Sequence, residues 1–177
     1  MRERLLSIAK RFLGEDRGAV LVEMTLITPL MIALSAGVFE FGNLIHNKLL
    51  IEAGLRDAAR YAARCNPKMY SDFGLTIDCK TNAENIALYG YITSTGGGAS
   101  RPPRVAGWTV VNVAIADAAD CHDAVVGGVT QYRSVTAQVC IVKATGTLNY
   151  EGSGLLAYLG LSPITLNGLH EERLIRF

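Results

Sequence analysis

The clearest pattern along the chain is one long apolar stretch near its beginning. Residues 24–39 contain no charged side chain, and 18 of the 27 residues at 19–45 are apolar. Glu23 and Glu40 are the only charged residues in this wider stretch. A helix that spans a bilayer needs about 20 mostly apolar residues, whereas a soluble helix of this length normally keeps a polar face. The pattern predicts one transmembrane helix at 19–45.

A helical pattern continues beyond this stretch. Residues 46–64 contain no proline and many alanines. Their spacing predicts two faces, an apolar stripe and a basic row: Ile51, Leu55, Ala58 and Ala62 form the stripe, and Arg56, Arg60 and Arg64 form the row. Asn66 and Pro67 predict the end of the helix. We therefore expect a stem helix over 19–64, about 69 Å long at 1.5 Å per residue, with an extracytoplasmic continuation at 46–65.

The remaining residues, 66–177, predict a separate head of mixed structure. A threonine opens a possible helix at 81–93, and a glycine- and proline-rich loop follows at 96–104. Alternating apolar and polar residues predict antiparallel strands at 108–116, 133–143 and 164–169, with a possible extension at 174–177, while 155–161 suits a short helix or loop. The expected fold class is α+β: a long membrane-spanning stem and a small head with a short helix and an antiparallel sheet.

All four cysteines follow the apolar stretch. Cys65, Cys79, Cys121 and Cys140 are an even number on one side of the membrane, which indicates an oxidising compartment and two disulfides. Four cysteines allow three connectivities, of which the local pairs 65–79 and 121–140 are favoured. Each bond would stabilise the head by about 2–4 kcal/mol.

Charge sets the orientation and excludes one class of function. The 17 basic and 16 acidic residues leave a net charge of +1, so the chain lacks the basic field of a nucleic-acid binder. Residues 1–18 hold five lysines or arginines against three acids, which favours a cytoplasmic N-terminus. The cysteines agree with this orientation and place the head outside the cytoplasm.

The residues that could carry chemistry do not form a catalytic pattern. The three histidines are scattered at positions 46, 122 and 170, and no triad is evident. The segment Asp120-Cys-His-Asp123 has metal-binding residue types, but no second Cys/His cluster follows at zinc spacing. We expect neither an enzyme nor a metal or other cofactor.

Four pieces of sequence carry a resemblance to a known family. They are Arg17-Gly-Ala-Val-Leu-Val-Glu23, Pro29, Val38-Phe-Glu-Phe-Gly42 and Leu55-Arg-Asp-Ala-Ala-Arg-Tyr-Ala63. The first is similar to a type IV prepilin processing site, a glycine and four apolar residues before a glutamate. Together the pieces resemble the TadE-like family of tight-adherence (Flp-type) pilus proteins.

The resemblance implies a role for individual residues. A prepilin peptidase would cut after Gly18, where a residue without a Cβ fits a tight groove, and Ala19 would become the new N-terminus. Glu23 would neutralise the amino group of a neighbouring subunit and set the assembly register. Pro29 would give the helix a flexible point. Glu40 is expected to be hydrated at the outer interface or to contact a partner. The stem motif adds Phe41, Gly42, Arg56 and Arg60.

The family resemblance also implies location and partners. We expect a minor pseudopilin of the bacterial inner membrane that supports pilus assembly. Its partners would be the prepilin peptidase, the major pilin and other minor pseudopilins, the inner-membrane assembly platform and the lipid bilayer. Two alternatives stay open. The chain could be an unprocessed single-pass protein with a disulfide-bonded extracytoplasmic binding domain, or its signal peptide could be removed before Ala36.

Overall fold

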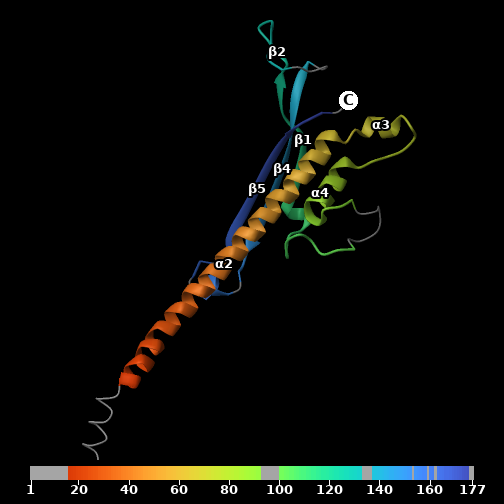
Figure 1. Ribbon diagram of the computed structural model, residues 1–177. Coiled ribbons are helices and arrows are strands. Elements are labelled where there is room, and N and C mark those ends of the chain that lie inside the picture. The colour runs from red at the N-terminus through yellow and green to blue at the C-terminus, as the bar shows by residue number, and fades with distance from the viewer. Residues whose placement is uncertain are drawn as a thin grey trace, which may run out of the picture. The chain divides into compact units, whose positions relative to one another are not determined.

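The chain divides into two units that share one helix. The computed structural model describes residues 16–92, 100–132, 137–152, 154–158, 160–161 and 163–175. The units are Met1–Gly42 and Asn43–Phe177, and helix α2 (Asp16–Arg64) contributes to both (Figure 1). The continuous stem helix predicted at 19–64 is thus confirmed. Residues 1–15 of the predicted leader lie outside the described residues.

An antiparallel sheet is the centre of the second unit. Its three strands lie in the order β1 (Val113–Asp123), β4 (Gln138–Tyr150) and β5 (Ile164–Arg173). A smaller sheet, β2 (Val125–Val126) with β3 (Val129–Thr130), lies in the connection between β1 and β4 (Figure 1). The α+β class with an antiparallel sheet is confirmed. The small β2–β3 sheet was not predicted.

The strands are displaced along the chain from the predicted positions. The strand expected at 108–116 begins only at Val113, because Trp108 lies in a buried loop and the short 3-10 helix η1 (Val110–Asn112) follows it. The strand expected at 133–143 corresponds to β4, which begins at Gln138 and runs on to Tyr150; residues 133–136 of the prediction lie outside the described residues. β5 extends from the predicted start to Arg173, so it ends just before the predicted extension at 174–177.

The helix expected at 81–93 is displaced towards the N-terminus. Helix α4 (Cys79–Tyr89) is capped by Asp78, whose carboxylate accepts the Thr81 N–H at 3.0 Å and the Thr81 hydroxyl at 2.7 Å. These hydrogen bonds lower the pKa of Asp78. Gly90 ends the helix in the left-handed conformation, with a φ of 80°. The aspartate, rather than the threonine, therefore opens the helix. Two short helices complete the unit, α3 (Pro67–Ser71) and α5 (Leu155–Tyr158).

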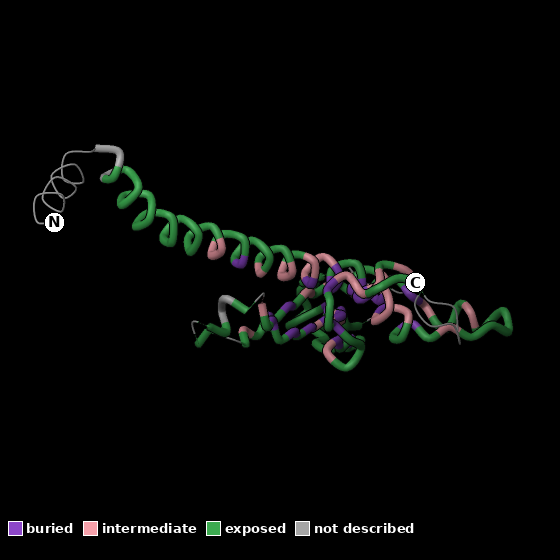
Figure 2. The backbone as a smooth tube through the Cα atoms, turned by 90° about the horizontal axis from the view of Figure 1, so that it is seen from below, coloured by how far each residue is buried: buried purple, intermediate pink, exposed green. Residues whose placement is uncertain are grey.

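The hydrophobic core lies between the helices and one face of the sheet. The predicted apolar stripe of α2 is fully buried, and the predicted basic row is exposed (Figure 2). α4 supplies Ala83, Ala87 and Leu88, the sheet supplies side chains from all three strands, and Trp108, the single tryptophan, is 1% exposed. The second half of the stem is therefore a structural part of the head.

Glycines permit a very close approach of α2 to its neighbours. A Cβ on Gly54 would lie 2.4 Å from the carbonyl oxygen of Ala87 in α4. On the sheet, Gly146 and Gly168 are directly paired across β4 and β5, and a Cβ on Gly168 would lie 2.6 Å from Leu55 Cδ1. A glycine usually weakens a strand. At Gly146, however, the Leu55 side chain of α2 occupies the space that a larger side chain would need.

Two disulfides link elements of the second unit to one another: one joins the end of α2 to α4, and the other joins β1 to β4. Cys65, just after α2, is bonded to Cys79, the first residue of α4. Cys121 is bonded to Cys140, which lies directly opposite it across β1 and β4. This is the connectivity that the spacing favours.

The Gly54 contact can be tested by adding a single methyl group. Gly54→Ala forces a Cβ against the α4 backbone, and we expect a loss of about 1–3 kcal/mol in the free energy of unfolding. Denaturation of the full chain in detergent, followed by Trp108 fluorescence, measures it. Gly37→Ala is the matched control, because a Cβ there meets nothing within 4 Å. Equal stability of Gly54→Ala and wild type would contradict the close approach.

Candidate functional site

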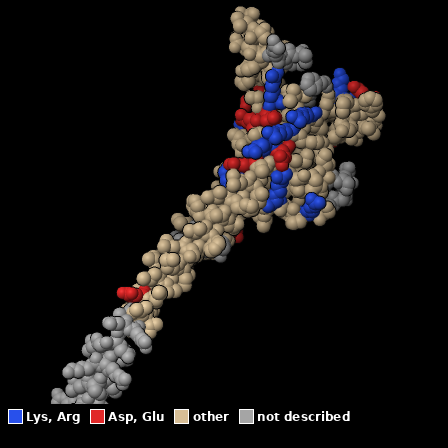
Figure 3. Space-filling view, in the orientation of Figure 1, with Lys and Arg blue, Asp and Glu red and all other residues tan. Residues whose placement is uncertain are grey.

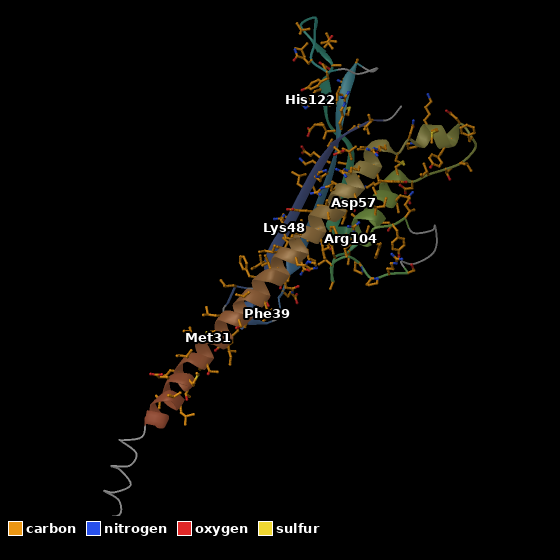
Figure 4. The ribbon with its side chains drawn as sticks, viewed as in Figure 1. Met31, Phe39, Lys48, Asp57, Arg104 and His122 are labelled. Carbon is orange, nitrogen blue, oxygen red and sulfur yellow. A yellow bond between two sulfur atoms is a disulfide. The ribbon has the colours of Figure 1, made fainter. Side chains whose placement is uncertain are left out.

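The first unit presents an apolar helix surface without any cover. Every described side chain at 20–35 is exposed (Figure 2). Met31 and Phe39 point away from the helix axis, with exposed fractions of 55% and 79% (Figure 4). By length and composition the helix can cross a membrane, and none of its most apolar window is buried. A surface this large and apolar is unfavourable in water and suits the hydrocarbon of a bilayer.

The uncharged polar side chains in this segment satisfy their own hydrogen bonds. The hydroxyls of Thr25 and Thr28 donate to the carbonyl oxygens four residues earlier, and the Ser35 hydroxyl donates to Met31 O at 2.8 Å. Such local bonds remove the need for water partners inside a bilayer. The helix also continues through Pro29.

The two glutamates of the segment differ in exposure. Glu23 is exposed and makes no ion pair with any residue that the structure describes. Glu40 is 4% exposed, although Phe41 beside it is 64% exposed. The expectation that Glu40 is hydrated at the outer interface or contacts a partner stays a prediction. A Cβ on Gly42 would meet nothing within 4 Å, so the helix surface at this glycine is open.

Polar contacts attach α2 to the sheet from the first residue of the second unit. The Asn43 side-chain amide donates to the hydroxyl of Tyr150, the last residue of β4, at 2.9 Å. Lys48 donates to the backbone oxygen of Asn167 in β5 and forms an ion pair with Glu52 at 3.0 Å. Sequence spacing gave no signal for Tyr150 or Asn167, which lie more than 100 positions from their partners.

A second attachment joins α2 to the loop after α4. Arg104 and Asp57 lie side by side in Figure 4, and their guanidinium and carboxylate atoms are 2.6 Å apart. The backbone N–H of Arg104 also donates to Leu88 O at 2.7 Å. Because the ion pair is partly exposed, its direct contribution to stability is small. Its geometric effect is to fix the loop against the stem.

The segment with metal-binding residue types is part of the hairpin between β1 and β4. Cys121 is committed to its disulfide, and Asp123 accepts a hydrogen bond from the Gln138 amide at 3.1 Å. His122 lies on the same strand (Figure 4). The described residues contain no group of three or more potential ligands placed to hold a metal ion.

Most of helix α2 matches the model of a known protein family. Residues 18–60 match the family model of TadE-like proteins. The chain carries a TadE-like segment. No curated protein and no solved structure matches the chain. TadE-like proteins are structural components of tight-adherence pili, so the match supports a pilus-associated, membrane-anchored protein.

The TadE-like segment contains most of the residues that the sequence singled out. They are Gly18, Ala19, Glu23, Pro29, Glu40, Phe41, Gly42, Arg56 and Arg60. The structure does not gather them at one point but distributes them along a single helix, from its first turns to its buried second half. An arrangement of this kind can anchor the chain and present contacts along its length.

The exposed apolar surface should determine membrane attachment. Replacing both Ile27 and Ile32 with arginine places two charges in the hydrocarbon, each costing about 2.5–3.5 kcal/mol at a helix centre. We expect this variant to be extracted from membranes by alkaline carbonate, whereas wild type is retained. The control replaces Val125 and Val126 with arginine; these residues are similarly exposed but form strand β2. Retention of the Ile27/Ile32 variant would show that this helix is not the anchor.

Proposed function

We propose that the protein is a minor pseudopilin of a tight-adherence pilus. A prepilin peptidase removes residues 1–18, the helix anchors the mature chain in the bacterial inner membrane, and the head lies on the extracytoplasmic side. One observation carries the proposal: a TadE-like match that begins at Gly18 covers an apolar helix whose described surface is uncovered at 20–35.

The position of Gly18 supports cleavage there. It lies in the first turn of α2, is exposed, and has no atom within 4 Å of where a Cβ would be. Glycine loses more conformational freedom in a helix than other residues do, so the helix opens more readily at this position. An opened glycine segment fits a narrow peptidase groove.

The position of Glu23 supports a role in assembly. It is an exposed carboxylate at the start of an apolar helix surface, and an unpaired charge in hydrocarbon is unfavourable. After cleavage, the amino group of Ala19 lies about one helical turn away along the axis, roughly 6 Å. The Ala19 amino group of a neighbouring subunit offers Glu23 a partner of opposite charge, and pairing offsets the desolvation of both groups.

The remaining partners follow from the same role. The mature helix would lie in the bilayer beside the major pilin and other minor pseudopilins. It would also bind the inner-membrane assembly platform. The disulfides of the head suit an oxidising compartment. An unprocessed anchor with an extracytoplasmic binding domain would have the same helix and disulfides but would keep residues 1–18.

Intact mass separates these possibilities. In membranes that contain the peptidase, we expect wild type to begin at Ala19 and Gly18→Leu to begin at Met1, because the leucine side chain blocks the groove. Gly14→Leu is the matched control within the leader and should be processed normally. A wild-type chain that begins at Met1 supports the unprocessed anchor, and one that begins at Ala36 indicates signal peptidase.

Glu23 should affect assembly without affecting cleavage. Glu23→Gln keeps the shape of the side chain and removes its charge, so we expect normal processing and at least about a tenfold loss of pili, because the Ala19 amino group loses its partner of opposite charge. Glu23→Asp keeps the charge and should restore part of the loss. Sheared pili and the mass of the processed chain are measured together. Normal piliation of Glu23→Gln would exclude the pairing.

A further inference from the structure

The two disulfides of the second unit differ in how far they are exposed. Cys65 and Cys79 are 8% and 5% exposed, and the hydroxyl of Tyr61 lies 3.7 Å from the Cys65 sulfur. Cys121 is exposed, and its partner Cys140 is partly exposed. A thiolate must reach a disulfide sulfur before exchange can occur, so access helps to set the rate. The bond between Cys121 and Cys140 is therefore the one that an external thiol can reach.

The exposed disulfide joins two strands near one end of the β1–β4 hairpin. We name residues 120–132 and 137–141 the hairpin end, and Cys121 lies directly opposite Cys140 within it. The Cys140 carbonyl oxygen accepts the N–H of Leu174, so the Cys140 backbone faces the β5 side and not β1. Such a position in an antiparallel pair is a non-hydrogen-bonded one, where opposite side chains are closest. The disulfide is thus the cross-link between β1 and β4 at this position.

The hairpin end has little hydrophobic core of its own. Among the described residues, the core ends at Ile115 on β1 and begins at Val142 on β4, and residues 116–123 of β1 are all exposed. Within the described part of the hairpin end only Ala124 and Val139 are buried. The hairpin end also projects past the last turn of α2 (Figure 1). Segments with few buried apolar contacts open at a low cost in free energy, so this end depends on its disulfide.

The tip of the hairpin end suits the approach of a protein thiol. Residues 124–132 contain no charged side chain and form the tan surface at the top of Figure 3. Val125 and Val126 within the tip are exposed, and exposed apolar area favours contact with a protein partner. Asp123, two residues from Cys121, shares its strand face, and its carboxylate accepts a hydrogen bond from Gln138 at 3.1 Å. An attacking thiolate therefore meets one acid, which is already hydrogen-bonded, on this face of β1.

We propose that the bond between Cys121 and Cys140 is a thiol–disulfide exchange site for a protein dithiol, and that its reduction releases the hairpin end. One thiolate of the dithiol attacks the Cys121 sulfur, the S–S bond breaks, and the Cys140 sulfur leaves as a thiolate and takes up a proton. The second thiolate of the dithiol then attacks its own partner sulfur in the mixed disulfide, and Cys121 leaves and is protonated. The dithiol is oxidised to a disulfide, and the two cysteines gain its two electrons.

Reduction at this site should open the hairpin end and leave the rest of the head folded. The core that contains Trp108 does not include the hairpin end, and the buried bond between Cys65 and Cys79 continues to link α2 to α4. We therefore expect backbone amides of the hairpin end to exchange hydrogen at least about tenfold faster after reduction. Trp108 fluorescence should not change, because the core around it stays packed.

Controlled reduction of the full chain in detergent tests the choice of site. The probe is reduced thioredoxin whose second active-site cysteine is replaced by serine, so that the mixed disulfide persists, and dithiothreitol is used in parallel. Alkylation of free thiols and peptide mass then identify each cysteine. We expect thioredoxin on Cys121, and reduction by dithiothreitol at least about tenfold faster at this bond than at the buried one. Attachment of thioredoxin to any other cysteine, or equal rates at the two bonds, would overturn the proposal.

Matched double variants test the consequence of reduction. Cys121→Ser/Cys140→Ser should keep the Trp108 fluorescence of wild type and show fast amide exchange in the hairpin end. Cys65→Ser/Cys79→Ser is the control, which should keep slow exchange in the hairpin end. Selective reduction of folded wild type gives the same readouts if a variant does not fold. The proposal fails if loss of the exposed bond leaves exchange in the hairpin end unchanged, or if reduction of wild type at this bond abolishes the native Trp108 signal.

Discussion

The structure depends on one helix that meets two different environments. At 20–35 the described side chains of α2 are exposed and mostly apolar on every side, as a helix in hydrocarbon requires. In its second half the apolar residues occupy one face, with Ile51 and Leu55 fully buried, while arginines occupy another. The change in pattern occurs within one helix, without a break in its residue range.

The head cannot be separated from the stem in energetic terms. Ala58, Ala59, Ala62 and Ala63 are all fully buried and belong to the same core as the sheet and α4. Small side chains and Gly54 let the helix backbone approach α4 closely, and close packing of this kind leaves little tolerance for added volume. A head cut free of residues 43–64 would expose one face of its sheet and lose the residues that cover it.

Local patterns predicted the fold well where the signal lies within one element. The stem helix, its buried stripe, its basic row and the disulfide pairing all depend on spacing along a short segment. The start of α4 was missed because Asp78, not Thr81, supplies the capping oxygen. The true length of β4 was missed because Gly146 is explained only by side chains from a distant helix. Contacts such as Asn43 with Tyr150 have no local signature.

The placement of charge on α2 bears on the proposed orientation of the chain. Under the positive-inside rule, arginines close to the end of a membrane helix favour retention in the cytoplasm, yet Arg56, Arg60 and Arg64 follow the apolar segment on the side where both disulfides form. On the proposed orientation these arginines cross the membrane with the head, against their own electrostatic preference. They pair with no described acid of their own chain.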